Sequence, residues 1–198
     1  MSPGAKAAGW WPVRRRDLED LLTGIGQRLR RGTSVFLVGE TSQLYEGWIA
    51  EGRSVHLAAA APDGAALGRA LEVPAGNGGV AVVLESPGDV IPLPDGHEAR
   101  ARVVATPGEG VPPHALRLLH FDPYSVSFRL IARGDEHDYR VVLEFLKHGW
   151  MNVDEMNVLL EKLLPRFTSQ TIQQDPAEFR RKYKGLVQMW RAEAGSLR

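Results

Sequence analysis

The chain contains no cysteine and no long apolar run. The absence of cysteine excludes disulfides and thiolate metal sites. No apolar segment approaches the roughly 20 residues that a membrane-spanning helix requires, and residues 1–16 lack the apolar core of a secretory signal. We therefore expect a cytoplasmic protein with no membrane segment.

The bulk composition is that of an ordinary globular protein, but its charge is unevenly spread. Of 198 residues, 43% are hydrophobic and 24% charged. The net charge is zero, yet residues 1–35 and 166–198 each carry a balance of +4, which leaves −8 between them. Basic ends could contact nucleic acid or an acidic partner. Solvated helix faces are the simpler interpretation, and the acidic middle argues against a nucleic acid held by the central region.

The first part of the chain alternates between strand and helix patterns. We expect residues 1–13 to be flexible and an amphipathic helix to follow, because apolar residues recur there at a spacing of three to four. Short apolar runs bounded by turn residues predict buried strands. These runs are SVFLVG (34–39), RSVHLAA (53–59) and GGVAVVLES (78–86), with short helices between them, and ARARVVA (99–105) and ALRLLHF (115–121) as a strand pair.

From residue 122 the pattern changes to helices. Asp122–Pro123 and Asp175–Pro176 each combine a capping residue with a proline at the first helical position, which is a strong start signal. The sequence therefore predicts an α/β domain over 14–121, with a mixed sheet flanked by helices, and a C-terminal helical bundle over 122–198. On the last helix, Phe179, Tyr183, Leu186 and Trp190 should form the buried face.

Four collinear segments carry a family resemblance. They are GETSQLYEGW (39–48), SPGDVIPLPDG (86–96), HFDPYSVSFRLIARG (120–134) and HDYRVV (137–142). Together they resemble a family of small bacterial nucleotidyltransferase-like proteins, related to the toxins of AbiE-type abortive-infection systems, over about residues 30–185. The resemblance implies a polymerase-beta-type fold. In that fold a glycine turn approaches the triphosphate, an Asp-x-Asp pair and a third acid hold Mg²⁺ or Mn²⁺, and the metals bridge the phosphates.

The positions that the resemblance assigns to metal binding are changed. Glu40 stands at the second glycine of the turn, where a carboxylate would repel a phosphate. Ser54 and His56 stand at the two positions of Asp-x-Asp, and Val83 at the third acid. Glu85 follows two residues later, on the same face of the strand, and could substitute for the third acid.

Other candidate nucleotide-binding positions are partly retained. Leu130 replaces the lysine that the resemblance implies, and the neighbouring Arg129 is expected on a different helix face. The positions of the resemblance that are retained are Gly39, Thr41, Ser42, Asp122, Tyr124, Arg133, Gly134 and Asp138.

Several of these candidates have both a structural and a functional interpretation. Thr41 and Ser42 either bind phosphate at a helix start or cap the helix, and capping is favoured. Arg133 and Asp138 either form an ion pair that orients the helices or line the cleft.

A metal site is conceivable but disfavoured. His56 could join Glu40 and Glu85 as a one-histidine, two-carboxylate site. One histidine in place of two aspartates suits magnesium poorly, because Mg²⁺ prefers oxygen ligands. A lone histidine in a strand is more often hydrogen-bonded and structural, so we expect no resident metal or other cofactor.

Two functional hypotheses follow. In the first, the chain is a catalytically degenerate nucleotidyltransferase that serves as a binding or regulatory module for a protein partner, in a toxin–antitoxin, defence or stress setting. In the alternative, it is active and uses Mg²⁺ or Mn²⁺, held by Glu40, Glu85 or Asp89, to move a nucleotide onto RNA, protein or a small molecule. The first is favoured because the whole acid set is replaced and phosphoryl transfer depends on charge neutralisation. Convergence of Glu40, Glu85 and a third acid in one cleft would favour the second.

Overall fold

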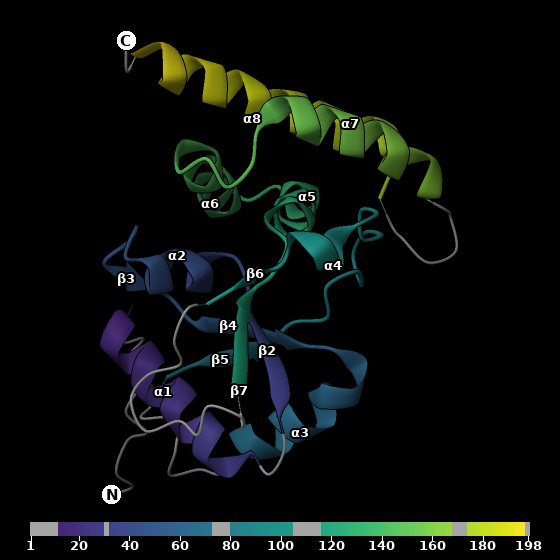
Figure 1. Cartoon of the computed structure of the whole chain (residues 1–198). Helices are drawn as coiled ribbons and strands as arrows, with labels where there is room; N and C mark the ends of the chain where they lie inside the picture. Colours follow the sequence, from purple (N-terminus) through teal and green to yellow (C-terminus); the bar gives the residue numbers. More distant parts are fainter. Residues whose placement is uncertain (1–11, 30–31, 73–79, 105–115, 168–173, 197–198) are drawn as a thin grey trace, which may run out of the picture.

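The protein has a mixed α/β architecture. The computed structural model describes residues 12–29, 32–72, 80–104, 116–167 and 174–196. Within them lie eight α-helices, one short 3₁₀ helix, a five-stranded sheet and a two-stranded sheet (Figure 1). Most of the N-terminal segment expected to be flexible, residues 1–11, lies outside the described residues. Val13, at its end, is buried.

The five strands of the large sheet occur where the apolar runs predict them. In chain order the strands of both sheets are β1 (Val13–Arg14), β2 (Thr33–Leu37), β3 (Glu51–Gly52), β4 (Val55–Ala59), β5 (Val82–Leu84), β6 (Arg102–Val103) and β7 (Leu116–His120). The large sheet has the order β5-β4-β2-β7-β6. β2 runs antiparallel to β4 and parallel to β7, β4 is parallel to β5, and β6 is antiparallel to β7. The expected mixed sheet and the expected β6–β7 pair are confirmed, whereas the small β1–β3 ladder was not predicted.

The helices α5 (Pro123–Arg133) and α8 (Pro176–Ser196) begin at the expected Asp-Pro pairs. In chain order the helices are α1 (Arg15–Arg28), α2 (Glu40–Glu46), α3 (Ala61–Leu71), α4 (His97–Arg100), α5, α6 (Glu136–Lys147), α7 (Val153–Leu163), the 3₁₀ helix η1 (Leu164–Arg166) and α8. The Asp122 carboxylate accepts hydrogen bonds from the backbone N–H groups of Tyr124 and Ser125, and Pro123 occupies the first turn. The Asp-Pro start signals of α5 and α8 are therefore confirmed.

Two buried apolar clusters hold the elements together. One joins α1 to the sheet and includes Leu18, Ile25 and Leu57. The other joins α5, α6, α7 and α8, and α5 and α6 lie between the sheet and the α7–α8 layer (Figure 1). No helix within the described residues is both long and apolar enough to cross a bilayer.

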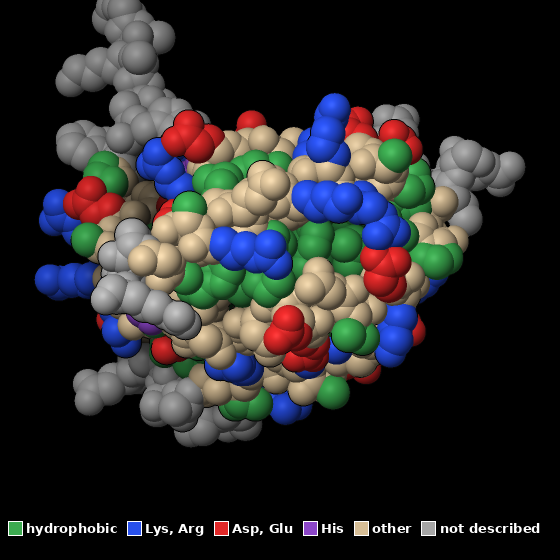
Figure 2. Space-filling model, turned by 90° about the horizontal axis from the view of Figure 1, so that it is seen from above, with side chains coloured by type: hydrophobic (Ala, Val, Ile, Leu, Met, Phe, Trp, Pro, Cys, Tyr) green, Lys and Arg blue, Asp and Glu red, His purple; other side chains and the backbone are tan. Residues whose placement is uncertain are grey.

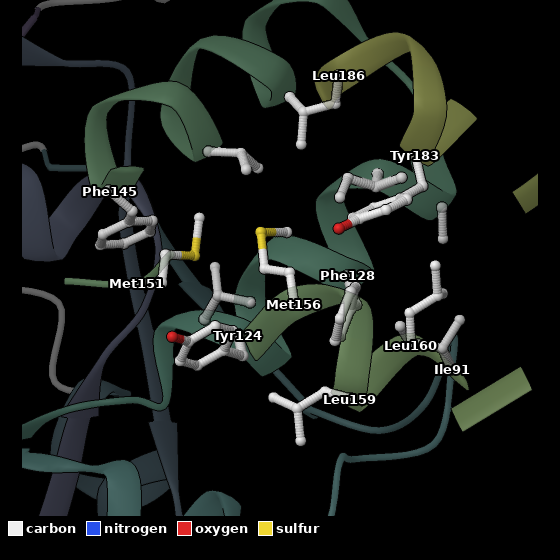
Figure 3. Packing of buried hydrophobic residues seen from close by; sticks show 14 of the residues in the cluster. Ile91, Tyr124, Phe128, Phe145, Met151, Met156, Leu159, Leu160, Tyr183 and Leu186 are labelled. Carbon is white, nitrogen blue, oxygen red and sulfur yellow. The ribbon is translucent and has the colours of Figure 1, made fainter. Parts of the chain in front are cut away.

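The second cluster is built around a fully buried methionine. Met156 lies between Phe128 and Tyr183 on one side and Phe145 on the other (Figure 3). The predicted buried face of α8 is confirmed for Phe179, Tyr183 and Leu186, which are at most 3% exposed, whereas Trp190 is only partly buried against the same cluster. Ile91, from the loop after β5, also belongs to this cluster. It links the α/β part to the helices next to the candidate site.

Candidate functional site

A narrow cleft lies where the β2–α2 turn, β4 and the loop after β5 face α5 and α6. Its volume is about 70 Å³, well below the roughly 300–1,000 Å³ of typical ligand pockets. Apolar residues such as Ile91, Phe121 and Val126 line part of it. Seven of the sequence-predicted site residues also line it, namely Gly39, Glu40, His56, Glu85, Arg129, Arg133 and Asp138. Thr41, Ser42, Ser54 and Val83 do not.

The turn that opens the cleft needs its glycine. Gly39 has φ 60° and ψ −124° as the N-cap of α2, a conformation that L side chains rarely adopt. Glu40 follows as the first helical residue, and its side chain is only 13% exposed. A Glu40 carboxylate oxygen lies 3.5 Å from His137 Nε2. The expected negative charge therefore does line the cleft, beside a histidine of α6.

Thr41 and Ser42 do not cap α2, contrary to the preferred interpretation. Both are 1% exposed. Thr41 Oγ1 accepts a hydrogen bond from the backbone N–H of His56 at 2.7 Å, and Ser42 Oγ donates to the carbonyl of Leu37 at 3.0 Å. The cap position is occupied by Gly39, which has no side chain to cap with. The two hydroxyls instead attach α2 to β4 and β2.

A chain of polar contacts crosses the centre of the site. Ser54 Oγ lies 2.8 Å from His56 Nε2, and His56 Nδ1 lies 2.6 Å from Glu85 Oε1. The second oxygen of Glu85 accepts a hydrogen bond from Arg129 Nη1. Arg129 Nε lies 3.3 Å from Asp89 without hydrogen-bond geometry. The Glu85 and Arg129 side chains are 7% and 15% exposed, so this is a largely buried ion pair.

The environment of Glu85 keeps it ionised. Burial raises the pKa of its carboxyl group, but the hydrogen bond from His56 and the contact with the Arg129 guanidinium outweigh burial and hold the pKa at about 2. A carboxylate with both oxygens engaged in this way has little capacity left for a metal ion.

Arg133 and Asp138 form the predicted ion pair. Arg133 Nε and Nη2 donate to the two Asp138 oxygens at 2.8 and 2.6 Å, and Asp138 is 3% exposed. The hydrogen bond to Asp138 raises the pKa of the Arg133 guanidinium further. The pair joins the end of α5 to the start of α6 and also lines the cleft, so the structural and functional interpretations are compatible.

Two sequence expectations about side-chain placement are corrected. Val83 pairs with His56 in the sheet but is 40% exposed and outside the cleft, whereas Glu85 reaches His56. The acid that contacts His56 is therefore Glu85, directly after β5 and two residues beyond the position that the resemblance implies. Arg129 and Leu130 were expected on different faces of α5, yet both line the cleft, because that helix presents a wide face to it.

The carboxylates share the cleft without forming a metal-binding group. Glu40, Glu85 and Asp138 all line it, as the active-enzyme hypothesis requires. Each of them, however, faces a basic side chain, His137, Arg129 and Arg133 respectively. Within the described residues, no three His, Asp or Glu side chains are placed so that they could hold a metal ion.

Some residues of the cleft were missed by sequence reasoning. In the sequence, His137 is not spaced from other histidines or acids as metal ligands are. Its contact with Glu40 depends on how α6 packs against α2. The apolar lining residues Ile91 and Leu93 lie in the SPGDVIPLPDG segment. That segment is one of the four that carry the family resemblance. Its two apolar side chains were the only feature of the sequence that could have indicated an apolar lining of the cleft.

Four basic residues lie close together on α8, and two of them are paired within the protein; the four are Arg180, Arg181, Lys182 and Lys184. Arg180 pairs with Glu161 of α7, and Lys182 donates to the carbonyl of Ala132. Arg181 and Lys184 line a shallow hollow beside Arg180, and Figure 2 shows Lys and Arg side chains lying around an apolar area on this face. This arrangement agrees with the solvated helix face expected from the sequence.

Comparisons with protein-family models, curated proteins and solved structures give no match of any of the three kinds. The family resemblance therefore stays a hypothesis that rests on the quoted segments.

Proposed function

We propose that the chain is a catalytically degenerate, nucleotidyltransferase-like protein that acts as a binding or regulatory module for a protein partner. The observation that carries the proposal is the state of Glu85. Its two oxygens are engaged by His56 and Arg129, and its pKa is held at about 2. Glu85 is therefore already paired with a positively charged side chain of the protein, that of Arg129.

The rest of the cleft supports the same proposal. Two-metal phosphoryl transfer needs several carboxylates free to bind the ions that neutralise the phosphates. Here Ser54 and His56 stand where the resemblance implies two of those acids, and Asp138 is paired with Arg133. Glu40 adds a negative charge at the turn. Without bridging metal ions, the negative charge of a triphosphate would be repelled by the Glu40 carboxylate.

The alternative, an active nucleotidyltransferase, has one observation in its favour. Glu40, Glu85 and Asp138 line the same cleft. For these acids to bind Mg²⁺ or Mn²⁺, the Glu85–Arg129 and Asp138–Arg133 pairs would first have to separate. Because breaking a buried ion pair is costly, this hypothesis ranks second.

Calorimetric titration with ATP, CTP, GTP and UTP, with and without Mg²⁺ or Mn²⁺, tests the proposal. We expect no metal-dependent binding by the unmodified chain. The double variant Ser54→Asp/His56→Asp restores both acids that the resemblance implies and should gain metal-dependent binding. The matched variant Ser54→Asn/His56→Asn has side chains of the same shape without the charge and should gain none.

Metal-dependent micromolar binding by the unmodified chain would overturn the proposal and favour the active enzyme. Failure of the aspartate variant to gain binding, while it remains folded by circular dichroism, would count against placing Ser54 and His56 at the metal positions.

A further inference from the structure

Three side chains at the edge of the cleft, Ser54, His56 and Glu85, form a hydrogen-bonded serine–histidine–carboxylate triad, called the relay below. Ser54 lies in the bend directly before β4 and His56 lies within β4, and their side chains contact each other. Ser54 Oγ lies 2.8 Å from His56 Nε2, and His56 Nδ1 lies 2.6 Å from Glu85. Both distances are within the range expected for an activated nucleophile, its base and the group that orients the base.

The direction of the hydrogen bonds follows from the charge on Glu85. An ionised carboxylate only accepts hydrogen bonds, so His56 Nδ1 must carry the proton that it shares with Glu85. In the neutral imidazole, Nε2 is then the acceptor, and the Ser54 hydroxyl donates to it. This is the polarity in which a histidine removes the proton of an attacking serine.

The relay is held firmly at one end and is accessible at the other. Glu85 is anchored by Arg129, and the backbone N–H of His56 donates to Thr41 Oγ1 at 2.7 Å. The Glu85 side chain is 7% exposed and that of His56 25%, and Ser54 is partly exposed. A small molecule can therefore reach the hydroxyl, while the base cannot easily change its orientation.

We propose that Ser54 is a base-activated nucleophile that accepts an acyl group from a small activated carboxylic ester. In the reaction, Ser54 Oγ bonds to the ester carbonyl carbon as its proton moves to His56 Nε2. The bond to the leaving group then breaks, the leaving group departs as an anion, and His56 releases the proton to solvent.

This inference does not rest on the proposed function. A site that has lost its metal ligands for nucleotidyl transfer can still carry a nucleophile, because acyl transfer of this kind uses proton transfer rather than a metal. The two ideas also have separate readouts, nucleotide binding in one case and a covalent acyl group in the other.

The test uses p-nitrophenyl acetate and the full chain. We expect release of p-nitrophenolate, a mass gain of one acetyl group, and peptide mapping that places the acetyl group on Ser54. Ser54→Ala should abolish the modification at this position, and His56→Gln should slow it by about 100-fold or more, the usual effect of losing a general base. Ser86→Ala, which removes an exposed serine next to Glu85, should leave the rate unchanged.

Circular dichroism and thermal melting establish that each variant is folded. Ser54→Ala removes one partly exposed oxygen and should melt like the unmodified chain. Acetylation confined to other residues, or an unchanged rate at Ser54 in folded His56→Gln, would overturn the proposal.

Discussion

Replacing Arg129 by alanine should lower the free energy of unfolding by about 3 kcal/mol or more, the usual cost of breaking a buried ion pair by removing one partner. The Glu85 carboxylate is 7% exposed and loses the guanidinium that donates a hydrogen bond to it in this variant. His56 still hydrogen-bonds the buried carboxylate, and Arg133 still interacts with it electrostatically. Urea unfolding at neutral pH, where Glu85 is ionised, measures the difference from the unmodified chain.

Arg140→Ala is the matched control for this prediction. Arg140 pairs with Glu136 on the surface of α6, and the two side chains are 71% and 78% exposed. Exposed pairs of this kind contribute about 0–1 kcal/mol. If Arg129→Ala costs no more than Arg140→Ala, the Glu85–Arg129 pair does not stabilise the cleft in the way described.

Replacing Asp122 by alanine should also destabilise the protein strongly, by about 3–5 kcal/mol. Asp122 is fully buried, caps α5, and accepts hydrogen bonds from Arg100 Nε and Nη2 at 2.9 Å each. It also accepts a hydrogen bond from the Ser125 hydroxyl at 2.7 Å. The alanine variant leaves the Arg100 guanidinium without its carboxylate and the first turn of α5 without its cap.

Asp175→Ala separates the capping effect from the buried pair. Asp175 begins α8 with the same Asp-Pro pair and accepts from the backbone N–H groups of Ala177 and Glu178, but it is exposed. Loss of an exposed cap costs about 1 kcal/mol. Chemical denaturation of both variants should therefore show a larger loss for Asp122→Ala, and equal losses would contradict the role given to Arg100.

Much of the fold could be predicted because its signals are local. An Asp-Pro pair fixes the start of α5 and of α8 within a few residues, and the apolar runs of β2 and β4 stand out against their turns. The β1–β3 ladder could not be predicted, since strands of two residues have no period to detect. Its pairing depends on how the chain before α1 packs against the end of α2.

The site could be predicted only in part. Seven of the residues that the resemblance suggested line one cleft. The contacts within the cleft could not be read from the sequence, because Glu85 and Arg129 are 44 residues apart and meet only through tertiary packing. The role of Thr41 was missed for the same reason, since its hydroxyl bonds to a strand rather than to its own helix.

Titration of the Glu85 side chain tests the proposed function most directly. The ¹³C NMR shift of its carboxyl carbon can be followed as the pH is lowered, with Glu85→Gln identifying the signal. We predict a midpoint near pH 2, because the contacts with His56 and Arg129 outweigh the effect of burial. A midpoint at the ordinary value of 4.5 would contradict this prediction, since it would mean that Glu85 is not held by an internal cation and remains available to a metal ion.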